Sequence, residues 1–331
     1  MQIPRLKPLV KTLFYGAACV AASALAATAD SVKDFPTKPV RFIVPFVAGA
    51  GTDATARLIA AKLTELWGQQ VVADNRTGAT GSIGVDLTAH AAPDGYTICL
   101  ISASHAVNAA VNPKLPYDLT KDLIGVTQAT SLFYAVYINP TVPANNVKEL
   151  IAYAKANPSK LNFGSSGTGG LEHFAGEMFN HMAGIKMVHI PFKGAAAAIL
   201  ANLGNEIQVG FSTLIGVKPQ VANGRLRLLA ITSAKRSPAV PDTPTVAESI
   251  PGYEVNQWYG IVISSKVPMP IVNKINAGIV AALKSPEINQ RLVADGSIPV
   301  GSTPDQFSTH IKAEIAKWHK FAQDTRIVLT Q

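Results

Sequence analysis

The stretch "VRFIVPFVAGAGTDATARLIAAKL", residues 40–63, decides the fold of this chain. It predicts a buried strand over residues 40–46, a loop of small residues, and an amphipathic helix over residues 53–67. A second stretch, "KLNFGSSGTGGLEHFAGE" at residues 160–177, repeats this order in the other half of the chain. Such loops lie at the carboxyl ends of strands, and a helix N-terminus offers unpaired N–H groups and a positive dipole end. Two such loops facing each other would therefore bind a small anion.

Strand-like and helix-like segments alternate along the whole chain, which predicts an α/β protein with largely parallel sheets. The last predicted helix carries Phe307, Ile311, Ile315 and Trp318 at helical spacing, and we interpret this apolar stripe as core. A chain of 331 residues is also in the size range where a single core usually divides in two.

Residues 1–29 predict a secretory signal peptide. They contain three basic side chains and no acidic one, an apolar run, and small-x-small cleavage sites that end at Ala26 or Ala29. The run is short for a membrane anchor, and the residues before Cys19 do not fit a lipoprotein site. Cleavage would leave Cys99 as the one cysteine, which excludes an internal disulfide in the exported chain.

The charge pattern argues against nucleic acid as a partner. The formal net charge is +8, and removal of the three basic residues of the signal peptide lowers it to +5. This mild basicity suits an anionic ligand, but Lys and Arg are scattered and form no run or stripe. We therefore expect no nucleic-acid binding.

The first loop also matches a dinucleotide-binding motif, G-x-G-x-x-A, through Gly49, Gly51 and Ala54, with Asp74 a little over twenty residues beyond. Pro45 interrupts the strand before the loop, and an exported protein has no ready supply of NAD. A P-loop is excluded because no G-K-[ST] sequence occurs. We therefore expect a different anion and no cofactor.

Two catalytic or metal-binding alternatives depend on serine and histidine. Ser166 and His173 would form the pair of a serine hydrolase, although "GSSGTGG" does not fit G-x-S-x-G. His173, His181 and His189 are eight residues apart, which is not ligand spacing on one helix face. We expect neither catalysis nor a metal. His173 has a second interpretation, because beside the loop its ring could donate to a carboxylate.

Asp53 also has two interpretations. In the first turn of a helix a carboxylate is favoured by the helix dipole, which makes Asp53 structural. Beside an anion site it could instead hold water or accept from a ligand hydroxyl. The structural interpretation is the stronger one.

With these residues laid out, the chain resembles the periplasmic receptors of tripartite tricarboxylate transporters, also called Bug receptors. The resemblance runs from the opening strand and first loop nearly to the end of the chain. It is carried, in order, by "AAPDGYTICL", "PYDLTKDL", "VKELIAYAKANPSKLNFGSSGTGGLEHFAGE", "HIPFKG", "GRLRLLAITSAKRSPAVPDTPTVAES", "WYGIVI" and "KWHKF".

The resemblance implies a two-lobed periplasmic binding protein of the type II, Venus-flytrap class, with a ligand cleft between the lobes. Residues 35–130 together with 255–331 would form one lobe and residues 131–254 the other, closing by a hinge. The first loop would bind the ligand together with the second loop and residues near "PFK". The candidate ligand-binding residues are Phe46, Val47, Ala48, Gly49, Thr52, Asp53, Ser102, Ser165, Ser166, Gly167, Thr168, Gly169, His173, Phe192, Ser212 and Thr213.

The implied function is capture of a small carboxylate in the periplasm and delivery to the membrane permease subunits of the transporter, without catalysis. The scattered charges and the lack of heptad repeats give no reason to expect more than a monomer. Ser212 and Thr213 stand where many members carry an aspartate, and the first loop departs from the usual P-G-G-x-x-D. Loss of that negative charge disfavours an amino-acid ligand and favours a second carboxylate or a flat apolar body, as in an aromatic dicarboxylate such as terephthalate. A periplasmic sensor that feeds a signalling partner remains an alternative.

Overall fold

The computed structural model describes residues 34–49 and 51–325, so the predicted signal peptide lies outside the described residues. The chain divides into two compact units, residues 1–37 and 38–331, and every element below belongs to the second. Its strands are β1 (Val40–Val44), β2 (Val71–Asn75), β3 (Thr97–Ser102), β4 (Leu123–Ile138), β5 (Asn162–Ser165), β6 (Val188–Pro191), β7 (Val209–Thr213), β8 (Arg227–Ile231), β9 (Asn256–Ser264) and β10 (Ser297–Pro299).

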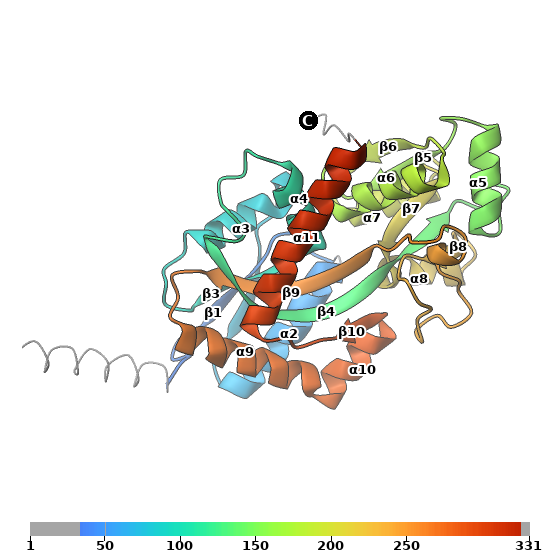
Figure 1. Ribbon diagram of the computed structural model, residues 1–331. Coiled ribbons are helices and arrows are strands. Elements are labelled where there is room, and N and C mark those ends of the chain that lie inside the picture. The colour runs from blue at the N-terminus through green and yellow to red at the C-terminus, as the bar shows by residue number, and fades with distance from the viewer. Residues whose placement is uncertain (1–33, 50, 326–331) are drawn as a thin grey trace, which may run out of the picture. The chain divides into compact units, whose positions relative to one another are not determined.

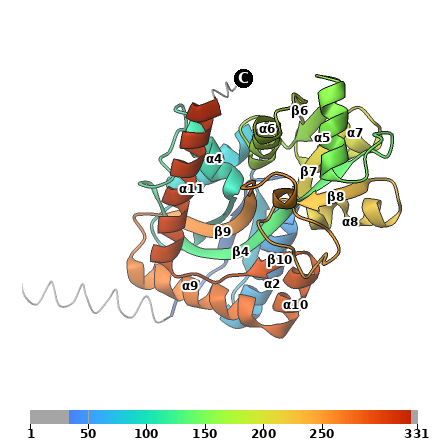
Figure 2. The ribbon, with the colours of Figure 1, turned by 45° about the vertical axis from the view of Figure 1, so that its right-hand side comes forward.

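The helices begin directly after strands at several places, as expected for an α/β chain. Figure 1 shows α11 in front of β4 and β9, and the views agree that it runs beside α4 (Figure 2). The helices are α2 (Gly51–Trp67), α3 (Ser82–Ala89), α4 (Ala103–Val111), α5 (Val147–Ala156), α6 (Leu171–Ala183), α7 (Ala195–Leu203), α8 (Leu214–Ala222), α9 (Met269–Lys284), α10 (Pro286–Ala294) and α11 (Pro304–Thr325), with short 3₁₀ turns η1 (Ala79–Gly81) and η2 (Val246–Glu248).

The strands form one mixed sheet in the order β2-β1-β3-β9-β4-β7-β5-β6, with β8 and β10 also paired to β4. Pairings are parallel among β1, β2 and β3 and among β5, β6 and β7. They are antiparallel wherever β4 or β9 takes part. The prediction of largely parallel sheets is therefore wrong at the centre, because β4 and β9 pair antiparallel with each other and with their other neighbours.

Strand β4 changes its partner along its length. Its residues from Leu123 to Phe133 pair with β9, and those from Tyr134 to Ile138 pair with β7. One continuous strand thus joins a sheet half that contains β1, β3 and β9 to a half that contains β5, β6 and β7. Figure 2 shows β4 passing between these two groups of strands.

Helix α11 covers this crossing with the stripe that the sequence predicts. Phe307, Ile311 and Trp318 are buried, and Ile315 packs against the same core, so this prediction is confirmed. Phe307 packs on Gly260 of β9, where a Cβ atom would lie 2.1 Å from its Cζ. Glycine at 260 therefore lets the helix approach the strand closely.

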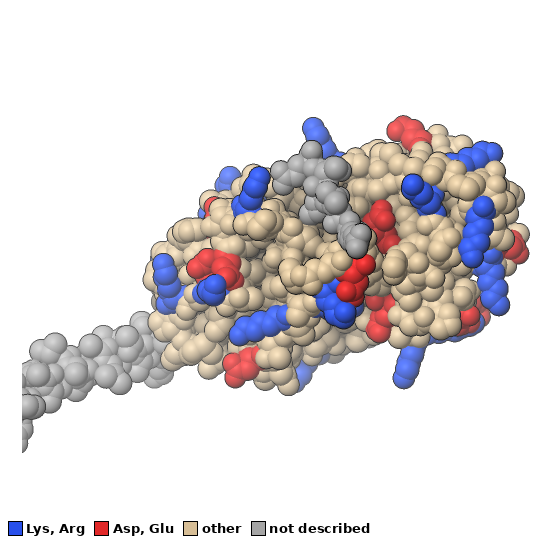
Figure 3. Space-filling view, turned by 45° about the horizontal axis from the view of Figure 1, so that its top comes forward, with Lys and Arg blue, Asp and Glu red and all other residues tan. Residues whose placement is uncertain are grey.

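The surface carries charge of both signs. On the face in Figure 3, Lys and Arg side chains are dispersed among uncharged residues, with acidic side chains between them. Among the described residues, no helix is both long enough and apolar enough to cross a membrane.

Candidate functional site

A small cavity of about 50 Å³ lies where five helices begin. Helices α2, α4, α6, α7 and α8 each contribute residues from their first turn or from the position just before it. Helix N-termini carry unpaired N–H groups and positive partial charge, so their convergence favours an anion. The cavity is lined by Phe46, Val47, Gly51, Thr52, Ser102, Ser104, Tyr134, Ser166, Glu172, Gly194, Ala195, Ser212, Thr213, Gln257 and Tyr259.

The first loop is held by the buried carboxylate of Asp53. Gly49 N–H donates to its Oδ2 at 3.0 Å, the side chain of Asn75 donates to Oδ1 at 2.9 Å, and Arg57 Nε lies 3.0 Å from both oxygens. Burial raises the pKa of Asp53, but the hydrogen bonds from Arg57, Gly49 and Asn75 outweigh it and leave the pKa below its usual value. The carboxylate is thus ionised and satisfied by the protein itself.

The acidic residue of the dinucleotide motif is engaged elsewhere. Asp74 Oδ2 lies 2.7 Å from Arg41 Nη2 and 3.0 Å from Arg76 Nε. An aspartate held by two guanidinium groups does not have the free carboxylate that a ribose hydroxyl needs. This geometry supports a different anion at the first loop.

Two stacked histidines hold the second loop from behind. The ring centroids of His173 and His189 are 3.8 Å apart with an interplanar angle of 15°. Gly169 N–H donates to His173 Nδ1 at 3.2 Å, and Ser165 Oγ lies 2.6 Å from His189 Nε2. Burial lowers the pKa of His173 to about 4 and, with the charge of His173, that of His189 to about 3. Both rings are therefore neutral near pH 7.

A buried acid, Glu172, faces the small cavity from the first turn of α6. Its residue surface is 6% exposed, and Ser166 N–H donates to Oε2 at 2.6 Å. Burial raises the pKa of Glu172, against the hydrogen bonds from Ser166. The hydroxyls of Tyr134 and Tyr259 line the same cavity, and burial raises the pKa of Tyr134 far above its usual value and that of Tyr259 to about 12. Both hydroxyls stay protonated and can donate to an anion.

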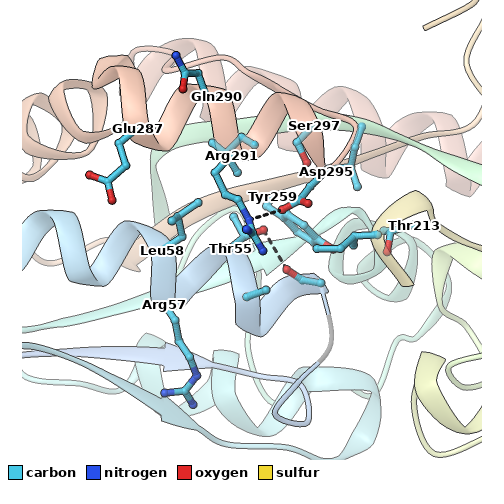
Figure 4. Close-up of a pocket in the computed structure, with 15 residues that line it drawn as sticks. Thr55, Arg57, Leu58, Thr213, Tyr259, Glu287, Gln290, Arg291, Asp295 and Ser297 are labelled. Carbon is cyan, nitrogen blue, oxygen red and sulfur yellow. Dashed lines mark hydrogen bonds and ion pairs between the residues drawn. The ribbon is translucent and has the colours of Figure 1, made fainter. Parts of the chain in front are cut away.

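A larger cavity of about 760 Å³ lies on the other side of the α2 N-terminus, between α2 and α10 (Figure 4). It shares Gly51, Thr213 and Tyr259 with the small cavity. Its two basic side chains have partners within the protein: Arg291 Nε lies 3.4 Å from Asp295 Oδ2, and Arg57 holds the Asp53 carboxylate of the first loop. We therefore take the small cavity, where donors converge, as the candidate anion site.

The structure brings part of the predicted site together. The predicted residues that line the small cavity are Phe46, Val47, Thr52, Ser102, Ser166, Ser212 and Thr213. Those that do not line it are Ala48, Gly49, Asp53, Ser165, Gly167, Thr168, Gly169, His173 and Phe192. Several of the residues outside the lining form hydrogen bonds with one another, and these bonds stabilise the conformation of the two loops.

Other lining residues escaped the sequence prediction. Ser104, Glu172 and Ala195 lie in the first turns of helices, a position that could have indicated them. Tyr134 and Tyr259 come from the crossing strands, and nothing in the sequence indicated that these strands reach the site. The sequence predicted a cleft without a negative charge, because Ser212 and Thr213 stand where many members carry an aspartate. Glu172 places an acidic side chain in the lining that this prediction did not anticipate. The lining residues outside the prediction are Gly51, Ser104, Tyr134, Glu172, Gly194, Ala195, Gln257 and Tyr259.

The geometry gives no support to a hydrolase or a metal centre. His173 Nδ1 accepts from Gly169 N–H, and its Nε2 lies 3.9 Å from Glu177, so the ring is not directed at Ser166. Ser165, which does contact a histidine, is 1% exposed and outside the cavity. In the part of the chain that the structure describes, no group of three His, Cys, Asp or Glu residues could hold a metal ion.

Comparison with protein families gives a match over residues 55–327 to the family described as "Tripartite tricarboxylate transporter family receptor". The UPF0065 protein in the tcbD-tcbE intergenic region of Pseudomonas sp. (strain P51) is 32% identical, over 94% of this chain and 95% of that protein. Protein BugT of Bordetella pertussis is 34% identical, over 89% of this chain and 91% of that protein.

Solved structures share the fold. R. palustris Rpa4515, solved with adipate, has a TM-score of 0.85 and 34% identity over 89% of this chain and 99% of that one. The periplasmic binding protein BugD has a TM-score of 0.83 and 29% identity over 88% and 99%. MatC from Rhodopseudomonas palustris, with bound malate, has a TM-score of 0.81 and 28% identity over 86% and 99%.

Proposed function

Because the chain belongs to the tripartite tricarboxylate transporter receptor family, we propose that it captures a small carboxylate in the small cavity and delivers it to the membrane subunits of such a transporter. The family is one of periplasmic solute-binding receptors and not of enzymes, and the predicted α/β binding-protein fold is confirmed. The single observation that carries the proposal is the convergence of five helix N-termini on one small cavity.

The ligand carboxylate is held by neutral donors. Residues at the start of five helices, together with Tyr134 and Tyr259, line the cavity, and we assign the donors to the main-chain N–H groups of these N-termini and to the two tyrosine hydroxyls. A hydrogen bond to a charged group contributes about 1.5–3 kcal/mol, so four or five of them leave micromolar binding after the cost of association. The loops around Asp53 and His173 position these donors, which is the role we assign to the predicted residues that lie outside the lining.

The ligand we propose is a di- or tricarboxylate, including aromatic dicarboxylates such as terephthalate. The relatives Rpa4515 and MatC, solved with adipate and malate, support this class. The sharing of Gly51, Thr213 and Tyr259 by both cavities gives a long ligand room to extend beyond the small cavity. Ser212 and Thr213 line the small cavity without charge, in agreement with a ligand that lacks an ammonium group.

The two lobes of the receptor are proposed to be residues 35–130 with 255–331, and residues 131–254. The change of partner along β4 between Phe133 and Tyr134 supports the first boundary, and the start of β9 at Asn256 supports the second. We propose that the protein is exported by residues 1–29, with cleavage near Ala26 or Ala29, and acts as a monomer in the periplasm beside its permease subunits.

The test is thermal unfolding of the protein against succinate, malate, citrate, adipate, terephthalate, benzoate, aspartate, glutamate and NAD. A ligand at a hundred times its dissociation constant stabilises the folded state by about 2.7 kcal/mol, which gives a clear rise in melting temperature. The proposal predicts a rise with at least one di- or tricarboxylate and none with NAD. A rise with NAD alone would contradict it.

A further inference from the structure

The small cavity contains a charge of the wrong sign for the ligand proposed above. None of its lining residues is Lys, Arg or His, and Glu172 is its one ionisable acid. The Glu172 carboxylate already accepts the Ser166 N–H at 2.6 Å, a donor that the family resemblance would assign to the ligand. In this structure the protein's own carboxylate therefore occupies part of the anion site.

A ligand carboxylate that enters this cavity comes close to Glu172. The volume of about 50 Å³ leaves room for only a few water molecules between them. Two carboxylates at close range in a buried site cannot both ionise without a cation, and such pairs retain one shared proton. The helix N-termini stabilise one negative charge there, but none of the lining side chains supplies a positive charge for a second.

We propose that Glu172 makes capture of the carboxylate proton-linked: the site takes up one proton from solvent as the ligand binds, and Glu172 and the ligand carboxyl share it. The proposal rests on the carboxylate-receptor function. Binding forms and breaks no covalent bond other than that of the transferred proton. The complex differs from the free protein by the ligand anion and one proton taken from solvent. Ligand binding therefore weakens as the pH rises, because the shared proton becomes harder to take up from solvent.

Other titratable groups around Glu172 do not supply this proton near neutral pH. Of the elements packed on α6, β5 and β7 carry no titratable side chain. His105 of α4 is buried and His189 of β6 is half-buried, and desolvation lowers their pKa values to about 4 and about 3. On α2, Asp53 is paired with Arg57.

The remaining titratable groups near Glu172 are three tyrosine hydroxyls and two side chains on α6 itself. Burial raises the pKa of Tyr259 to about 12 and those of Tyr134 and Tyr137 further, so these hydroxyls stay protonated. On α6 itself, burial lowers the pKa of His173 to about 4 and raises that of Glu177. Glu177 does not line the cavity, which makes it the matched control.

The experiment is isothermal titration calorimetry of the full chain with the member of succinate, malate, adipate and terephthalate that most raises the melting temperature. Titrations in HEPES, imidazole and Tris at each pH from 7 to 9 give the number of protons taken up from the buffer dependence of the enthalpy. Burial raises the pKa of Glu172, so uptake should reach about one proton per ligand by pH 9. The dissociation constant should then rise about tenfold per pH unit.

Glu172→Gln should bind with no proton uptake and a dissociation constant that changes less than about twofold from pH 7 to 9. Glu177→Gln should keep the uptake and pH dependence of the unaltered protein. Because Gln is close in size to Glu, retained affinity in Glu172→Gln also reports a folded site.

The results that would overturn the inference are distinct. Carboxylate binding without proton uptake in the unaltered protein would remove it while leaving the receptor function intact. Loss of binding in Glu172→Gln, with aspartate bound more tightly than succinate by the unaltered protein, would show that an ionised Glu172 accepts the ligand's ammonium group. No binding of any carboxylate would remove both the inference and the proposed function.

Discussion

Asp53 stabilises the first loop by satisfying donors from three places in the chain. Its carboxylate accepts from Gly49 in the loop, from Arg57 one turn along α2, and from Asn75 at the end of β2. Asn75 also donates to the Phe46 carbonyl at 3.0 Å, which ties the start of the loop to the same cluster. Sequence reasoning favoured this structural role from the position of Asp53 in the first turn, where the helix dipole favours an acid. The partners in β2 could not be predicted, because they come from a strand that neighbours the loop only after folding.

Asp53→Asn should lower the free energy of unfolding by about 2 kcal/mol at pH 7, because the charged hydrogen bonds are lost. The pKa of Asp53 is lowered in the folded protein, so its contribution is present above the unfolded pKa of about 3.8 and is lost as pH falls through the folded value. Denaturant unfolding at pH 7 and at acid pH should therefore show the difference shrink on acidification.

Asp94→Asn is the matched control, since Asp94 pairs with Lys38 at the surface and should contribute less than about 1 kcal/mol. Unchanged stability of Asp53→Asn together with loss of carboxylate binding would instead make Asp53 a ligand contact.

The second loop depends on a different element, the pair of histidines between α6 and β6. The position of His173 beside the loop allows it to donate to the ligand carboxylate, but its ring lies behind the loop against His189, with Nδ1 accepting from Gly169. The sequence could place His173 beside the loop but not the stacking partner, which is sixteen residues away on another element. The same limit applies to Tyr134 and Tyr259, whose strands contribute to the cavity only through the antiparallel crossing.

Because His173 and His189 have lowered pKa values, we expect the folded protein to lose stability in mild acid. Both histidines have folded pKa values near 4 and 3, below the usual value of 6.5, so the unfolded chain binds more protons between about pH 6.5 and 4. The free energy of unfolding should fall with decreasing pH in this window, by up to about 1.4 kcal/mol per pH unit for each histidine.

A double variant, His173→Gln with His189→Gln, should be less stable at pH 7 but should lose less stability on acidification to pH 4.5, measured by urea unfolding. His90→Gln, at an exposed position, should follow the unaltered protein. An equal pH dependence in all three proteins would contradict the assignment.

At the scale of the molecule, the alternation of strands and helices predicted the α/β class. What it missed was direction: β4 and β9 run antiparallel to their neighbours, because a strand's sense in a sheet depends on pairings distant in sequence. The crossing of these strands is also where the two proposed lobes join. The small cavity has room for only a few waters, so a ligand of the proposed size needs the lobes to move apart before it can bind.

Small-angle X-ray scattering with and without a saturating carboxylate tests this motion. The proposal predicts a smaller radius of gyration with ligand, because hinge closure brings the lobes together around it. NAD at the same concentration is the control and should leave the profile unchanged. Identical profiles with and without a carboxylate that raises the melting temperature would argue against a hinge.

The most direct test of the whole account is a crystal structure of the protein with the carboxylate that gives the largest rise in melting temperature. We expect one ligand carboxyl group in the small cavity, within hydrogen-bond distance of main-chain N–H groups at the helix N-termini and of the Tyr134 or Tyr259 hydroxyl. A carboxylate bound instead in the larger cavity beside Arg291, with the small cavity occupied only by water, would contradict it.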